Sequence, residues 1–460
     1  MTPRGPNCIT GKIFAPSMPF MPGAVWMWPQ RNHRKNVMPI RETITTRAAG
    51  ISGFLGLQRS TVGVLAMVVL VGMGENMAER FLPIYMMALG GGTLAIGLLQ
   101  AMDNLLSALY SFPGGYLSDR IGTKKSLLVF NLVAMVGFAL VILIPAWQAV
   151  LAGAVLFISW SAISLPATIS LIYKVLPQNK RTMGVSMHAL VRRIPMALGP
   201  LLGGVFIGVW GERDGVRLAF GAALVLAVAA LLLQQRMIED DTPDEKRSTD
   251  VCGLTPEKNP LKLLRLMNPA MKGLLVTDIL IRFCEQIPYA FVVVWCMKTV
   301  ADPVSAVQFG LLTTIEMATA VLVYIPVAYM ADRSTKKPFV LVTFIFFTFF
   351  PLVLLYSRSF EWLLAAFFLR GLKEFGEPTR KSLIMDLSPE SCKAGMFGLY
   401  YLIRDIFVAV AALGGAFLWQ ISPQTNLVTA FVFGIIGTVG FAVFGRDIPV
   451  PANNEEAPND

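Results

Sequence analysis

The chain has 460 residues, of which 55% are hydrophobic and 15% charged, and its formal net charge is +10. This composition lies outside the range of soluble globular proteins and indicates a membrane protein. Two histidines and five widely spaced cysteines argue against a zinc site, a Cys-His catalytic pair or a disulfide framework. We therefore expect no enzyme, no cofactor and no metal site.

Residues 1–58 are basic and rich in proline, and Pro16, Pro19 and Pro22 interrupt their apolar patch. This segment is too broken for a membrane span or a signal peptide, so we predict a disordered cytoplasmic tail. A span needs about twenty apolar residues. The chain after the tail has twelve such stretches: 61–88, 93–117, 125–146, 148–173, 184–210, 218–235, 270–298, 305–331, 338–357, 361–386, 394–419 and 427–445.

A short basic hinge, Pro113 to Lys125, lies between the second and third stretches. Pro326 to Lys337 repeats its Pro, Tyr, Asp, Arg and Lys-Lys with one residue deleted, after the eighth stretch. A long apolar chain with the same hinge in each half is a duplicated bundle. The first copy resembles the signature loop between helices two and three of the major facilitator superfamily. The residues that carry this resemblance are Gly115, Asp119, Arg120, Gly122 and Lys124, and Asp332 and Arg333 are the matching residues of the second copy.

The resemblance implies an all-α membrane protein whose twelve transmembrane helices form two pseudo-symmetric six-helix bundles. It places the bundles at residues 59–235 and 269–445, a cytoplasmic linker at 236–268 and an acidic tail at 446–460. Helices 1, 4, 7 and 10 would line the central cavity, and the hinge residues would act in conformational switching. The family consists of secondary transporters that move a small molecule by alternating access.

The first two stretches carry polar groups near mid-membrane, where such groups are costly and mark functional sites. They are Glu75, Asn76, Glu79 and Arg80 in the first stretch and Asp103 in the second. Glu75 and Glu79 lie one turn apart on one face, and we expect this pair to carry protons. The alternative is a polar network that satisfies itself and locks helices together.

The fifth stretch contains Gly199-Pro200-x-x-Gly203-Gly204, which resembles the antiporter motif of drug-efflux members of the family. Its glycines would let the helix bend and pack closely, and ordinary helix packing would also require them. Arg193 and Gly203-Gly204 recur as Arg404 and Gly414-Gly415 at a constant offset. We expect the two arginines to snorkel or to form an inner gate.

The second half carries more charge. Asp278, Arg282 and Glu285 share one face of the seventh stretch, and the eighth contributes Glu316. In the tenth stretch, the i, i+4 spacing pairs Arg370 with Glu374 and Lys373 with Glu377. These groups form either a mutually neutralised network or a substrate site, in which Arg370 or Lys373 would bind an anionic group. The sixth, ninth and twelfth stretches lack charges, and so does the third beyond its first residue, the hinge residue Lys125.

The cations otherwise follow topology. With both termini cytoplasmic, the predicted outer loops hold only Arg213, Arg217, Lys298 and Arg358, whereas the inner loops hold many more, Arg380 and Lys381 among them. This is the positive-inside pattern, so the basic balance reflects orientation and contact with lipid headgroups and not nucleic acid.

No Gly-x-x-x-x-Gly-Lys-Ser/Thr nucleotide-binding motif is present, so an ion gradient, of protons, is the expected energy source. The antiporter-like motif favours proton-coupled efflux of drug-like compounds or metabolites. The absence of an arginine from the fourth stretch and the cations of the tenth favour uptake or exchange of an organic anion instead. A non-transporting membrane sensor is a weaker hypothesis. We expect a monomer in a bacterial inner membrane.

Overall fold

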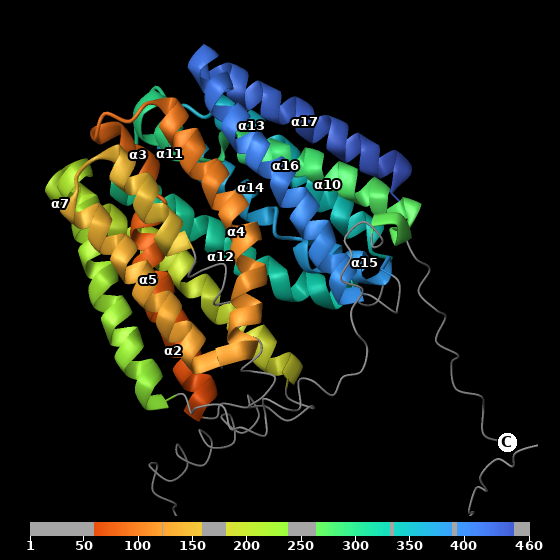
Figure 1. The fold of residues 1–460 in the computed structure, drawn as a ribbon. Helices are drawn as coiled ribbons and strands as arrows, with labels where there is room; N and C mark the ends of the chain where they lie inside the picture. The colour runs from red at the N-terminus through yellow and green to blue at the C-terminus, as the bar shows by residue number, and fades with distance from the viewer. Residues whose placement is uncertain are drawn as a thin grey trace, which may run out of the picture. The chain divides into compact units, whose positions relative to one another are not determined.

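The structure is a computed structural model that describes residues 59–121, 123–158, 181–237, 264–331, 335–388 and 393–445 (Figure 1). Within these residues every regular element is a helix. The elements are α2 (Arg59–Glu79), α3 (Leu82–Ala88), α4 (Thr93–Ile121), α5 (Thr123–Leu143), Trp147–Ile158, α7 (Arg181–Met237), α10 (Pro269–Tyr289), α11 (Val292–Val294), the π-helix η3 (Trp295–Thr299), α12 (Ala306–Ala331), α13 (Lys337–Tyr356), α14 (Phe360–Leu372), α15 (Glu377–Asp386), α16 (Lys393–Ile421) and α17 (Pro423–Phe444).

Each of the twelve apolar stretches holds at least part of a described helix. By length and hydropathy, six helices of the described residues can cross a membrane, and a seventh if α10 and its continuation Val292–Thr299, bent by 42°, form one span. Arg181–Met237 is two helices divided at Gly211, whose φ of +81° lies in the left-handed region that favours glycine. An all-helical architecture is what a hydrocarbon environment requires of the backbone.

Three helices break where proline or glycine occurs in the sequence. α2 ends at Glu79 and α3 resumes at Leu82, with Pro83 in the first turn of α3. α10 contains Pro288 and ends one residue later. Between α14 and α15 the chain passes through non-helical residues that end at Gly376, and a proline follows in the first turn of α15. Proline lacks an N–H and clashes with the preceding turn, so it starts helices readily and interrupts them internally.

We call the helices before residue 238 the first half and those after residue 263 the second half. Within the first half α2 packs on α7, and within the second half α10 packs on α16 and α17. The main contacts between the halves are made by α7 with α12 and by α4 with α16, and α3 also contacts α11. Small residues allow these crossings, because a Cβ at Gly310 would stand 2.6 Å from the backbone oxygen of Pro200.

Apolar side chains form both the interior and much of the exterior. Phe81 and Phe309 meet edge to face across the halves with ring centroids 5.6 Å apart. On α17, Val432, Ile436 and Val439 are exposed, and α17 is among the helices apolar enough to span a membrane. An exposed apolar helix face of this kind suits contact with hydrocarbon and not with water.

Candidate functional site: a charged pocket between the halves

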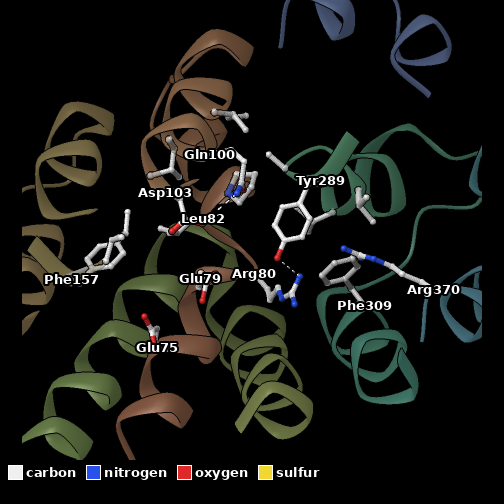
Figure 2. Close-up of a pocket in the computed structure, with 17 residues that line it drawn as sticks. Glu75, Glu79, Arg80, Leu82, Gln100, Asp103, Phe157, Tyr289, Phe309 and Arg370 are labelled. Atoms are coloured by element: carbon white, nitrogen blue, oxygen red, sulfur yellow. Dashed lines mark hydrogen bonds between the residues drawn. The ribbon is translucent and has the colours of Figure 1, made fainter. Parts of the chain in front are cut away.

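A pocket with about 750 Å³ of empty space, part of it open to solvent, lies between the two halves (Figure 2). The predicted spans 1, 4, 7 and 10 contribute to its lining, as the resemblance implies, and so do spans 2 and 8. Its walls are formed by Glu75, Glu79, Arg80, Leu82, Pro83, Ile96, Leu99, Gln100, Asp103, Phe157, Ile158, Tyr289, Ala290, Val292, Val293, Phe309 and Arg370.

The first half supplies the acidic side of the pocket. We call Glu75 and Glu79 on α2, together with Asp103 on α4, the acidic wall. Asp103 accepts a hydrogen bond from Gln100 Nε2 at 3.3 Å. Within the described part of the chain, Glu79 has no hydrogen bond, and no cation lies within 4.0 Å of the Glu79 or Asp103 carboxylate. Glu79 and Asp103 are therefore half-buried acids with no cation in direct contact among the described residues.

Tyr289 occupies the centre of the opposite side. Arg80 Nη1 donates a hydrogen bond of 2.9 Å to the Tyr289 hydroxyl, and the Arg80 guanidinium carbon lies 5.5 Å from the centroid of the ring. The Arg370 guanidinium carbon also lies 5.5 Å from that centroid. Tyr289 thus holds one arginine from each half near one ring (Figure 2). Arg80 turns away from the acidic wall, because its hydrogen-bond partner is this phenol and not Asp103.

Arg370 is enclosed but not saturated with partners. Its side chain is 5% exposed, and its Nε lies 3.3 Å from Glu316 Oε1. Phe350 and Phe367 lie 5.1 Å and 5.6 Å from its guanidinium carbon. Rings at such distances stabilise a cation but accept no conventional hydrogen bond. Among the described residues, no acceptor takes a hydrogen bond from the Arg370 guanidinium, which lines the pocket with its donors available.

Behind Arg370, four acids of the second half, Glu316, Glu285, Glu377 and Asp278, form a continuous chain of ion pairs with Arg370, Lys373, Arg282 and Arg380, which we call the paired network. Glu316 contacts Arg370 and, at 3.7 Å, Lys373; Lys373 lies 2.8 Å from Glu285. The next ion pairs are Glu285–Arg282 at 2.6 Å, Arg282–Glu377 at 3.2 Å and Glu377–Arg380 at 2.6 Å. Arg380 also contacts Asp278, which accepts a hydrogen bond of 3.0 Å from the Tyr400 hydroxyl. Four helical segments and the α14–α15 turn supply four acids and four cations, so charge balances within the network.

This network corrects the pairing expected in the tenth stretch. Arg370 does not pair with Glu374, nor Lys373 with Glu377, because the helix is broken between Leu372 and Glu377. The i, i+4 geometry exists only in a continuous helix. Asp278, Arg282 and Glu285, on the unbroken α10, do share one face and contact one another.

Arg380 was assigned to an inner loop by its position, and this was wrong. It lies on α15, its side chain is 1% exposed, and it contacts both Asp278 and Glu377. A buried guanidinium needs such carboxylates, since an unpaired charge in this environment is very costly. Lys381, the next residue, is 50% exposed.

Glu374 and Arg193 make a different connection. Arg193 Nη2 lies 2.7 Å from Glu374 Oε2, which joins α7 of the first half to the α14–α15 turn of the second. Near this ion pair, Thr314 Oγ1 on α12 donates to the Ala197 carbonyl of α7 at 2.8 Å. The corresponding arginine of the second half, Arg404, makes a local ion pair instead: its Nη2 lies 2.6 Å from Oδ1 of Asp405 on the same helix.

The glycines of the fifth stretch form close helix contacts. A Cβ at Gly199 would stand 2.7 Å from the Asn76 Cβ of α2, and one at Gly203 would overlap the Met77 carbonyl oxygen. Gly204 faces Ala306 of the second half in the same way. Asn76, expected in the substrate site, lies in this packing and not in the pocket lining: it is buried and donates to the Gly72 carbonyl at 2.8 Å.

The structure brings five of the predicted site residues into the pocket lining: Glu75, Glu79, Arg80, Asp103 and Arg370. It places Asp278, Arg282, Glu285, Glu316, Lys373 and Glu377 in the paired network. Of the hinge, Gly122, Asp332 and Arg333 lie outside the described residues, and for Gly115, Asp119 and Arg120 only the α4 backbone is described. The Lys124 carbonyl accepts a 2.8 Å hydrogen bond from Gln234.

Two functional candidates were missed. Tyr289 is not among the site residues predicted from the sequence, although a phenol in a span rich in charge is a recognisable hydrogen-bond partner. Gln100 is also missing from the predicted site residues, although it lies one turn from Asp103 and donates a hydrogen bond to it. In the described part of the chain, no group of three or more His, Cys, Asp or Glu is arranged to hold a metal ion.

Comparisons with known proteins agree with this architecture. The sequence model of the Major Facilitator Superfamily matches residues 64–301 and 289–459. An uncharacterised MFS-type transporter of Methanocaldococcus jannaschii is 24% identical over 382 residues, which cover 79% of this chain and 89% of the relative.

Solved structures show the same fold at low identity. A POT family transporter in complex with a thioalcohol-conjugated peptide matches with a TM-score of 0.69 and 14% identity, covering 85% of this chain and 96% of that chain. A nucleoside transporter matches with a TM-score of 0.68 and 13% identity, covering 84% of this chain and 98% of that chain. The human organic anion transporter MFSD10 matches with a TM-score of 0.57 and 15% identity, covering 83% of this chain and 98% of that chain. From the family match across both halves, this chain belongs to the Major Facilitator Superfamily, as an MFS transporter.

Proposed function

We propose that this protein is a proton-coupled secondary transporter that exports a small drug-like compound or metabolite. In this proposal twelve spans form two six-helix bundles, at residues 59–235 and 269–445, that rock around the pocket. One observation carries the proposal: Glu79 and Asp103 face the pocket without a cation, whereas every carboxylate of the paired network has one.

A carboxylate that is partly removed from water and lacks a counter-ion is costly in its ionised form. Two ligands can remove that cost, a proton or a cationic group of the substrate. If both use Glu79 and Asp103, they compete, and the protein exchanges one for the other across the membrane. Competition at a shared site couples an outgoing substrate to incoming protons without a separate proton channel.

The antiporter-like glycine motif supports the outward direction. Gly199 and Gly203 contact α2 immediately beside the segment that carries Glu79, and Gly204 contacts α12. In this proposal α7 rolls against both helices during the cycle, and the hinge residues, Arg193 and Arg404 take part in the switching. The second candidate, uptake or exchange of an organic anion, is favoured by the unsatisfied donors of Arg370.

We place the protein in a bacterial inner membrane as a monomer, with both termini cytoplasmic, on the basis of the loop cations. The basic N-terminal tail, the linker at residues 236–268 and the acidic C-terminal tail would then lie on the cytoplasmic side. Membrane lipids, protons and the substrate are the partners that this account requires.

Transport by the purified full chain in liposomes tests the proposal. Candidate cations, anions and zwitterions are loaded inside, and their exit is followed with and without an imposed pH gradient, together with the internal pH. We expect exit to be accelerated by a gradient that drives protons inward, with proton entry in a fixed ratio. Exit that ignores the gradient, or protons that move with the substrate, would contradict proton-coupled export.

A further inference from the structure

The charges of the pocket are segregated. The acidic wall lies on α2 and α4, whereas Arg370, with Arg80 and the Tyr289 hydroxyl, lies on the opposite side (Figure 2). Apolar and aromatic groups, among them Leu99, Val293 and Phe157, make up much of the rest of the lining. The pocket therefore offers polar groups of opposite sign on two sides and apolar groups elsewhere in its lining.

Each end lacks something that a ligand could supply. Glu79 and Asp103 have no cation within 4.0 Å in the described part of the chain. The Arg370 side chain is 95% buried, since 5% is exposed; its Nε is ion-paired with Glu316, but its two Nη groups make no hydrogen bond to the described residues. Its fork of donors matches a carboxylate, phosphonate or similar oxyanion.

A ligand with one charge would satisfy only one end. A plain amine would leave the Arg370 donors without an acceptor, and a plain carboxylate would leave Glu79 and Asp103 without a cation. Closing the pocket over an unsatisfied polar end loses hydration and gains no compensating bond. We infer that the transported substrate is a small zwitterion, with its ammonium group at Glu79 and Asp103, its oxyanion at Arg370 and Arg80, and an apolar body between them.

This inference rests on the proposed function and adds the class of substrate. It also accounts for both substrate classes suggested by the sequence, a proton-coupled export substrate and an organic anion. The acids of the first half and the cations of the second half would then recognise different ends of one molecule. Protons would compete only with the ammonium end. The other members of the paired network would hold Arg370 in place through Glu316 and would not contact the ligand.

Ligand binding to the purified full chain in detergent tests the inference with matched probes. One set is 4-(aminomethyl)benzoate, benzylamine and 4-methylbenzoate; the other is 6-aminohexanoate, pentylamine and hexanoate. Affinity is obtained from the concentration dependence of the thermal unfolding midpoint, followed by tryptophan fluorescence. We expect at least one zwitterion to bind on the order of tenfold more tightly than both of its singly charged partners, the effect of one charge-assisted hydrogen-bonded end.

Two variants assign the ends. Arg370→Gln should reduce the zwitterion to the affinity of its amine, and Glu79→Gln should reduce it to the affinity of its carboxylate. Arg358→Gln and Asp302→Asn, at exposed positions outside the pocket, should leave the zwitterion preference unchanged. Because Arg370 also contacts Glu316, Arg370→Lys serves where Arg370→Gln does not fold; a point charge without the fork should retain only part of the preference.

The inference is overturned if no zwitterion binds, if an amine or a carboxylate binds as tightly as its zwitterion, or if the exposed controls lose the preference equally. Proton release on binding, measured in weakly buffered solution, separates this outcome from failure of the proposed coupling. Zwitterion preference without proton release contradicts coupling alone. Proton release by amines that bind as well as zwitterions contradicts the substrate class alone.

Discussion

The acidic wall and the paired network both contain carboxylates at least partly removed from solvent, yet their surroundings differ. In the network, Asp278 contacts Arg380 and Glu285 contacts both Arg282 and Lys373. On the wall, Glu79 and Asp103 contact no cation of the described residues. A buried acid with a cation fixes structure, whereas one without a cation is available to an exchanging partner. The first half therefore supplies the carboxylates available to an exchanging partner, and the second half positions Arg370 in the pocket lining.

The largest effect should follow from breaking the paired network at Arg380. Arg380→Gln leaves the buried carboxylates of Asp278 and Glu377 without their shared cation, which should cost about 3–5 kcal/mol of stability. The unfolding midpoint in detergent and the yield of folded protein measure it. Lys381→Gln, at the exposed neighbouring position, should change stability by less than about 0.5 kcal/mol. Adding Asp278→Asn to Arg380→Gln should restore part of the loss; no recovery would mean that Arg380 acts through packing alone.

A smaller effect distinguishes the repeated glycines of the two halves. Gly203 and Gly414 occupy corresponding positions, but a Cβ at Gly203 overlaps the Met77 carbonyl, whereas nothing lies within 4 Å of a Cβ at Gly414. Gly203→Ala should destabilise the protein by about 1–3 kcal/mol. Gly414→Ala should be neutral or stabilise by about 0.5–1 kcal/mol, because alanine favours helix. Equal effects on the unfolding midpoint would show that the halves pack alike at these sites.

The ion pair between the halves should contribute less. Arg193 and Glu374 are about one-fifth exposed, so their coupling in a double-mutant cycle should be on the order of 1 kcal/mol. Its loss in Arg193→Gln should favour separation of α7 from the α14–α15 turn. Cysteine accessibility at Ala197, where the Thr314 hydroxyl reaches the first half, would rise. Unchanged accessibility in Arg193→Gln and Glu374→Gln would show that the pair does not hold this contact closed.

The smallest change in stability should come from the acidic wall itself. Glu79→Gln removes a charge that has no described cation to lose, so its effect should lie within about 0.5 kcal/mol. By comparison, Glu285→Gln leaves Arg282 and Lys373 with a weaker partner and should cost about 2–3 kcal/mol. Similar losses for both variants in the unfolding midpoint would remove the distinction between wall and network.

Sequence alone located the charges but not their partners. Hydropathy and the repeated hinge predicted an all-helical membrane protein, and five residues selected for their charge within spans line the pocket. The predicted pairing of Arg370 with Glu374 was wrong because the helix is broken before α15, where Gly376 is the N-cap and Pro378 lies in the first turn. Residue spacing indicates a contact only if the helix is continuous. Tyr289 and Arg380 depend on contacts between residues 209 and 102 positions apart in sequence, which no local pattern encodes.

The division between wall and network is tested most directly by separating proton-driven transport from exchange. Glu75→Gln, Glu79→Gln and Asp103→Asn are reconstituted beside wild type and the exposed control Asp302→Asn, with a substrate found in the liposome screen. Two rates are measured, transport driven by a pH gradient and exchange of labelled for unlabelled substrate without one. We predict that at least one wall variant loses the first rate and retains the second, while the control keeps both. Full coupling to the pH gradient in all three wall variants would contradict the proposal that these carboxylates carry the protons.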